Sequence, residues 1–78
     1  MSNSTYITLE AVPPGRKARI IGLDAGPGLA TRLMQMGLTP GIEVEVVSGN
    51  RGPILVKVRG VMIALSRGMA RKIFVEII

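Results

Sequence analysis

Short stretches of alternating apolar and polar residues run through most of this 78-residue chain. In segment 42–48 an apolar residue occupies every second position at first, with Glu43 and Glu45 between, which is the pattern of a strand with one buried face. The segment 54–59 alternates in the same way. A five-residue connection that contains glycine joins the two, so the pattern predicts an antiparallel hairpin.

Three further segments predict strands or turns. Segment 17–23 predicts a strand in which Ala18, Ile20 and Gly22 share one face. Segments 61–65 and 73–77 predict two more short strands, and the residues between them, 66–72, predict a tight turn or a single helical turn.

One segment has helical rather than strand spacing. Leu29, Leu33 and Met36 stand at i, i+4 and i+7, so they line one face of a helix predicted over 27–36. Pro27 suits the first helical position, because its missing N–H has no partner there in any case.

The end of this helix is the most informative local feature. Gly37 follows the last helical apolar residue and suits the left-handed residue that ends a helix, since glycine has no Cβ to clash. Leu38 is then expected to pack back onto Leu33. Pro40 and Gly41 suit the two central positions of a type II turn that leads into the next strand.

An equivalent turn precedes the first long strand. Pro14 and Gly15 have the residue types of the same two central positions, after the short segment 7–12. We interpret both Pro-Gly pairs, together with Gly37 and Leu38, as structural turns that position the rest of the chain.

These elements predict a mainly β protein formed by a single domain over 1–78. About five short strands with one inserted short helix, near 27–36, are too few for the two full sheets of a sandwich. A small, partly open barrel of the SH3-like kind is the economical solution, since a curled sheet protects its edges.

Composition narrows the function. The chain has no cysteine and no histidine, which excludes disulfides, thiolate metal sites and the usual general base. It has no secretory signal in Met1–Thr5 and no apolar run near the roughly 18 residues of a membrane span, so a cytoplasmic domain is expected. Mean hydropathy is +0.43, high for a small domain, and implies some exposed apolar surface.

Candidate chemistry is sparse. Ser48 and Ser66 have no histidine to activate them, so we expect no enzyme and no catalytic residue. Gly26-Pro27-Gly28 at the helix start lacks the lysine of a nucleotide-binding loop, and no cofactor is expected. Glu43 and Glu45 indicate a solvated acidic strand face rather than a metal site, so no metal ligand is assigned.

The excess of Lys and Arg, 10 against 5 Asp and Glu, leaves one alternative open. Basic residues cluster near Arg16 and again near Arg71, which permits binding to nucleic-acid backbones without sequence specificity. Tyr6 and Phe74 are the sole aromatic residues, and this argues against base stacking and against a polyproline-binding groove.

A protein-contact surface is the remaining interpretation. Methionines are adaptable apolar groups often used at binding surfaces, and outward polar residues of the helix can reach a partner. The candidate contact residues are Arg32, Met34, Gln35, Met62, Arg67 and Met69. The same surface would also serve self-association.

Several motifs together resemble one family. Pro-Pro-Gly at 13–15 precedes Ile-Ile-Gly-Leu at 20–23, and Met-Gly-Leu-Thr-Pro-Gly at 36–41 precedes Glu-Val-Glu-Val-Val at 43–47. From 9 to 75 the chain resembles the ferrous iron transport protein A (FeoA) family. The resemblance implies an SH3-like barrel in the cytoplasm and an accessory role in ferrous iron uptake. Its partner would be the FeoB membrane transporter, whose cytoplasmic part is a GTPase, and any membrane association would come through that partner.

Two functions of different classes therefore stay open. The first is a noncatalytic adaptor that docks on the GTPase part of the FeoB-like transporter and supports its assembly or activity. The alternative is a basic SH3-like module that binds nucleic acid or regulates another protein.

Overall fold

The computed structural model describes residues 6–49 and 51–78. Met1–Thr5, where the sequence predicts no secretory signal, and residue 50, in the predicted 49–53 connection, lie outside the described residues. In chain order the elements are β1 (Ile7–Thr8), the 3-10 turn η1 (Leu9–Ala11), β2 (Lys17–Leu23), α1 (Pro27–Gln35), β3 (Glu43–Ser48), β4 (Ile54–Val58), β5 (Val61–Leu65), α2 (Arg67–Ala70) and β6 (Ile73–Ile77).

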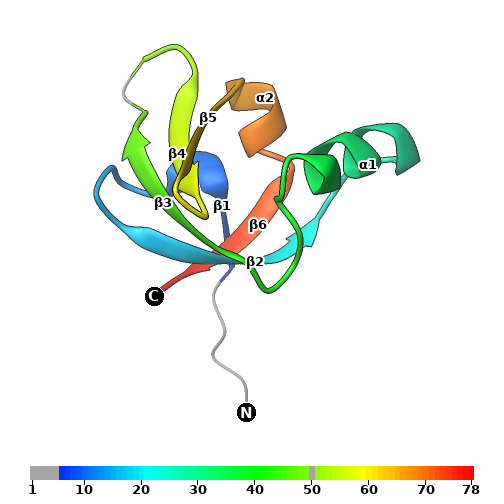
Figure 1. The fold of residues 1–78 in the computed structure, drawn as a ribbon, viewed down its shortest axis with the longest axis horizontal. Helices are drawn as coiled ribbons and strands as arrows, with labels where there is room; N and C mark the ends of the chain where they lie inside the picture. Colours follow the sequence, from blue (N-terminus) through cyan, green and yellow to red (C-terminus); the bar gives the residue numbers. More distant parts are fainter. Residues whose placement is uncertain (1–5, 50) are drawn as a thin grey trace.

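The strands form one antiparallel sheet in the order β1-β6-β2-β3-β4-β5. The sheet curls on itself, and β1 and β5 are its two edges (Figure 1). The described residues form six strands where the sequence predicts about five. The additional strand is β1, which consists of two residues and forms by pairing Ile7 with Val75 and Thr8 with Phe74 of β6.

Apolar side chains fill the inside of the curled sheet. Alternate residues of β2, β3, β4 and β6 are buried, as the alternation of the sequence predicts. The buried core comprises Leu9, Val12, Ala18, Ile20, Leu33, Leu38, Val44, Val46, Ile54, Val56, Val58, Leu65, Ala70, Ile73 and Val75.

A β-bulge in β2 corrects one prediction about this inner face. Ile20 pairs with Val75 of β6, but the next pair joins Gly22 to Phe74, so Ile21 is an extra residue in the ladder. The bulge shifts the alternation by one position. Leu23, paired with Ile73, therefore packs against the core where simple alternation had placed Gly22.

Helix α1 matches the predicted helix to within one residue and projects from one side of the sheet (Figure 1). Gly26 is its N-cap and Pro27 its first residue. Leu33 is fully buried, whereas Leu29 and Met36 are partly buried against the core. No helix in the described ranges, 6–49 and 51–78, is long and apolar enough to cross a membrane.

The second helix, α2, is a single turn in the segment where the sequence predicts either a tight turn or one helical turn. The hydroxyl of Ser66 caps it by accepting a hydrogen bond from the Met69 N–H at 3.2 Å. This turn places Ala70 in the core and leaves Arg67 beside η1.

Candidate partner-contact surfaces

The exit from α1 is fixed by a complete Schellman motif. The Leu38 N–H donates to the Leu33 carbonyl at 3.0 Å, and the Gly37 N–H donates to the Met34 carbonyl at 2.9 Å. Gly37 has the positive φ, 89°, that this motif requires. The outward residues of the last helical turn are therefore held in a defined orientation by the core beneath them.

The two Pro-Gly turns bracket the β2–β3 pair. Gly15 and Gly41 have φ of 90° and 92°, and each turn is closed by a hydrogen bond at 3.2 Å, to the Pro13 carbonyl and to the Thr39 carbonyl respectively. The Gly15 N–H also donates to Val46 of β3 at 2.7 Å, and the Gly41 N–H donates to Ile20 of β2 at 2.7 Å. Each turn is thus anchored to the strand that the other turn begins.

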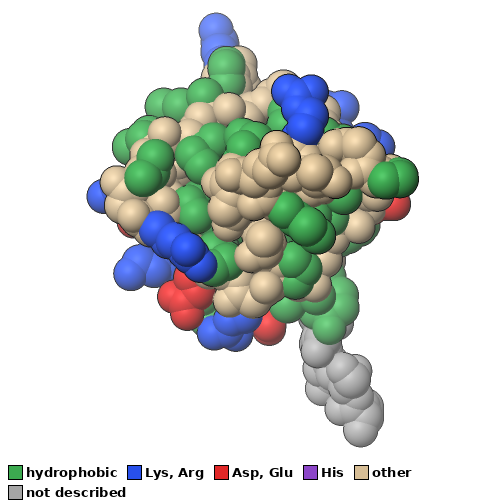
Figure 2. All heavy atoms as spheres, turned by 45° about the vertical axis from the view of Figure 1, so that its right-hand side comes forward, with side chains coloured by type: hydrophobic (Ala, Val, Ile, Leu, Met, Phe, Trp, Pro, Cys, Tyr) green, Lys and Arg blue, Asp and Glu red, His purple; other side chains and the backbone are tan. Residues whose placement is uncertain are grey.

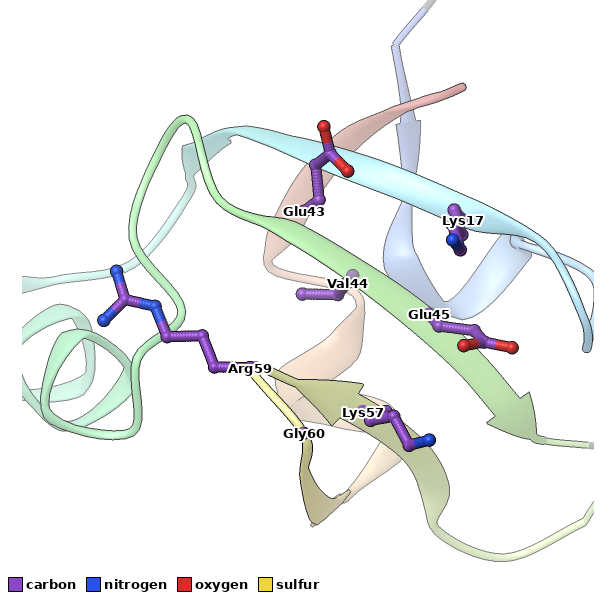
Figure 3. A pocket seen from close by; sticks show the side chains of 7 residues that line it. All are labelled: Lys17, Glu43, Val44, Glu45, Lys57, Arg59 and Gly60. Atoms are coloured by element: carbon purple, nitrogen blue, oxygen red, sulfur yellow. The ribbon is translucent and has the colours of Figure 1, made fainter.

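Charges of opposite sign alternate from strand to strand on the outer face of the sheet. In one row Lys17, Glu45 and Lys57 are register partners, and they lie side by side on β2, β3 and β4 (Figure 3). In the other row Arg19 approaches Glu43 at 3.5 Å and Glu76 at 3.8 Å. This face carries equal numbers of both charges, and opposite charges directly across strands stabilise a sheet modestly.

A shallow, open pocket lies over this face near the β4–β5 turn. Its lining comprises Lys17, Glu43, Val44, Glu45, Lys57, Arg59 and Gly60 (Figure 3). The Arg59 side chain extends away from the others, toward α1 (Figure 3). Because cations and carboxylates share the lining and pair across strands, the pocket offers no concentrated charge to a small ligand.

Glu10 of η1 holds a second group of charges together. Its carboxylate accepts a hydrogen bond from Arg71 Nε at 3.0 Å and lies 3.5 Å from Arg67 Nη1. The hydrogen bond from Arg71, with the positive charges of both arginines, lowers the pKa of Glu10 below its ordinary value. Arg67 also donates to the Gly49 carbonyl, so it ties α2 to η1 and to the loop after β3.

The candidate contact residues of α1 do not share one side of the helix. Arg32, Met34 and Gln35 are all exposed, and Met34 is 48% exposed. Successive helical residues are about 100° apart, so Arg32 and Met34 point to opposite flanks, with Gln35 on the solvent side. A single flat partner would contact one of these flanks.

The other candidate residues lie on β5 and α2. Met62 is 50% exposed on β5, whereas Met69 is partly buried against the core. The Arg67 guanidinium is engaged by Glu10 and Gly49. Met62 therefore presents an accessible apolar group, and Arg67 and Met69 contribute more to packing of α2 than to open surface.

Two residues of this region, Val61 and Glu10, are not among the candidates predicted from the sequence. Val61, the first residue of β5, is 60% exposed, more than Met34 or Met62. Its position directly after the Gly60 bend is the sequence signal, since a residue beside a hairpin turn lies at the end of a sheet. Glu10 was also missed, because its arginine partners are far away in the sequence.

Hydrophobic side chains are spread over the α1 side of the molecule, with Lys and Arg toward its margins (Figure 2).

The acidic residues do not converge. Across the part of the chain that the structure describes, no group of three or more Asp or Glu side chains could hold a metal ion. Glu43 and Glu45 instead face the cations of the neighbouring strands.

Comparison with known proteins identifies relatives over nearly the whole chain. Residues 7–77 match the sequence model of the FeoA domain. A protein of Methanocaldococcus jannaschii, named as a candidate Fe(2+) transport protein A, is 37% identical over 62 residues, which are 80% of this chain and 76% of that protein.

Two solved structures have the same fold. The crystal structure of an iron uptake regulatory protein, FeoA, superposes with a TM-score of 0.88 at 31% identity and covers 96% of this chain and 100% of that one. The zinc complex of Stenotrophomonas maltophilia FeoA has a TM-score of 0.81 at 29% identity, with 90% and 89% of the two chains covered. That protein is described as a prokaryotic SH3 domain protein and a candidate activating factor for ferrous iron transport. The SH3-like architecture expected from the sequence is thereby confirmed.

Proposed function

This chain belongs to the FeoA family, and we propose that it is a small noncatalytic accessory protein of ferrous iron transport that acts in the cytoplasm. The finer proposal is that it docks, as a single domain, on the cytoplasmic GTPase part of a FeoB-like membrane transporter. The observation that carries the proposal is the family match over 7–77, together with relatives named for iron transport.

The surface chemistry supports a protein partner. Met34, Val61 and Met62 expose 48%, 60% and 50% of their area, so apolar groups are available for burial at an interface. Methionine adapts its shape to a partner at low cost. The cations of the outer sheet face, in contrast, are opposed by carboxylates on neighbouring strands.

Titration of this protein onto the isolated GTPase domain, with GTP hydrolysis followed in parallel, tests the proposal. We expect saturable binding that changes only moderately between about 50 and 200 mM salt, because the contact is mainly apolar. Met34→Lys should weaken binding, since a charge would enter the interface. Arg32→Gln on the opposite flank is the matched control and should bind nearly as wild type.

Two results would contradict the docking proposal. One is an absence of binding at high micromolar concentration to both the GTPase domain and the full transporter. The other is binding to random duplex DNA that falls steeply between about 50 and 200 mM salt, which is the signature of counterion release. The DNA-binding experiment is needed because the net charge of the protein is +5. Salt-sensitive binding to DNA would support the nucleic-acid alternative.

A further inference from the structure

β5 is an edge strand whose outer backbone groups have no strand partner. It pairs with β4 alone, from Ile54 opposite Leu65 to Val58 opposite Val61. Arg59 and Gly60 have φ of 53° and 80°, which are the values of a two-residue type I′ turn.

This turn determines which backbone groups point outward. In a two-residue hairpin the residues that flank the turn form a hydrogen-bonded pair, and the pairs then alternate. Val61, Ile63 and Leu65 therefore direct their N–H and C=O groups to β4. Met62 and Ala64 direct theirs away from the sheet, about 6.8 Å apart along the strand.

The outer side of β5 is open. Met62 and Ala64 are both exposed, and within 6–49 and 51–78 no backbone hydrogen bond outside the β4 ladder reaches either amide. β5 also lacks the usual protection of an edge, because Val-Met-Ile-Ala-Leu contains no charge and no proline. The opposite edge, β1, is protected by its length of two residues.

The charges around β5 select the kind of strand that could pair there. Arg59 precedes β5, Lys57 is opposite Met62, and Arg67 follows β5. Among the described residues Arg59 has no carboxylate within salt-bridge distance, whereas Arg67 is paired with Glu10. A second copy of the chain would bring cation against cation at this edge, with a net charge of +5 on each copy.

We propose that β5 is a strand-addition site that takes an extended, mainly aliphatic segment of a partner protein, with an acidic residue at the end that meets Arg59. The added strand bonds to the outward N–H and C=O groups of Met62 and Ala64. One of its faces covers the Met62 side chain, and its other face covers Val61 and Ile63. Ala64 is small and leaves room for a large aliphatic side chain of the partner. This inference rests on the proposed function, because it takes the cytoplasmic part of the transporter as the partner protein.

Amide hydrogen exchange of the full chain tests this inference, alone and with a saturating amount of the transporter's GTPase domain. We expect exchange at Met62 and Ala64 to slow by at least about tenfold in the complex, because both amides enter a new ladder. Unchanged exchange at these two amides in a complex that does form would overturn strand addition and leave the docking proposal standing.

Proline substitution provides a second, independent readout. Met62→Pro removes an outward N–H without removing a donor to β4, and edge strands tolerate proline. We expect it to weaken binding by about tenfold, as for the loss of one or two hydrogen bonds, whereas the matched control Met62→Thr retains the amide and should cost much less. Native-like spectra of both variants establish that they fold. Equal affinities of the two variants would contradict the inference.

Two further experiments test the role of the Arg59 charge and the possibility of self-association. Arg59→Asn keeps a residue that tolerates positive φ and removes the charge, so binding should weaken by about threefold at low salt and less at high salt. Slowed exchange at Met62 and Ala64 that depends on protein concentration, with no transporter present, would identify a second copy as the occupant and overturn the choice of partner. No binding at all would overturn the proposed function, and this inference with it.

Discussion

The Leu38 N–H donates to the Leu33 carbonyl at 3.0 Å, and the side chains of both leucines are fully buried. Gly37 lies between them with φ of 89°. Gly37 therefore connects the last turn of α1 to a residue at the centre of the core. The orientation of the helix depends on the backbone conformation of this glycine.

Gly37→Ala should lower the free energy of unfolding by about 1–2 kcal/mol, the cost of a left-handed conformation for a residue with a Cβ. The new Cβ would meet only Val58 Cγ1 at 3.6 Å, an ordinary contact, so the loss is conformational rather than steric. Urea unfolding measures it. Gly37→Asn, which tolerates this conformation better, is the control and should lose less; equal losses would contradict the conformational explanation.

Glu10→Gln tests the charge group that joins η1 to α2. The pKa of Glu10 is lowered in the folded protein, chiefly by the Arg71 hydrogen bond, so its ion pairs stabilise the fold at pH values above the pKa of an unfolded glutamate. This stabilisation is lost as the pH falls through the folded pKa. Wild type should therefore exceed the variant in unfolding free energy at neutral pH, and the difference should disappear at low pH.

Thermal unfolding across this pH range measures that difference. Glu76→Gln is a suitable control, since its contact to Arg19 is long, 3.8 Å, and both side chains are about 40% exposed. A Glu10→Gln effect that is constant with pH would show that packing, rather than the ionised carboxylate, is responsible.

Arg59→Asn should stabilise the protein by about 0.5–1 kcal/mol. Arg59 has φ of 53°, which is unfavourable for arginine, whereas Asn-Gly is the preferred pair of a type I′ turn. Differential scanning calorimetry would detect the rise in Tm. Arg59→Val should lower Tm, because a β-branched residue tolerates this conformation poorly; a rise for both variants would contradict the turn argument.

Glu45→Lys should destabilise the sheet by about 1 kcal/mol at low ionic strength, since Glu45 stands in register between Lys17 and Lys57. Three like charges would then form one row. Raising the ionic strength from about 0.01 M to 1 M shortens the Debye length from about 30 Å to 3 Å and should remove most of the loss. Glu45→Gln is the control, and a salt-independent loss in Glu45→Lys would point to packing instead.

The turns could be predicted from the sequence because each depends on a few adjacent residues. Gly15, Gly37 and Gly41 all have the positive φ that their neighbours predict. The bulge at Ile21 could not be predicted, since it is a feature of the pairing between β2 and β6. The same reason applies to β1, whose two residues become a strand only beside β6.

Some features of the candidate contact surface could likewise be predicted from the sequence, and others could not. Helical spacing already implies that Arg32 and Met34 lie on opposite flanks, so that result was available from the sequence. The engagement of Arg67 by Glu10 was not, because residues far apart in the chain meet only through the packing of α2 on η1. The open edge at β5 likewise depends on strand order.

The charge rows on the outer face of the sheet also make the distribution of net charge over the molecule uneven. Three Lys and Arg residues and three glutamates oppose one another there, so the whole net charge of +5 arises from the remaining surface. The outer sheet face is therefore nearly neutral, and the excess positive charge lies on the rest of the molecule. The long-range electrostatic field would steer an acidic partner toward the other faces of the molecule. Ionic strength would therefore change the association rate more than the lifetime of the complex.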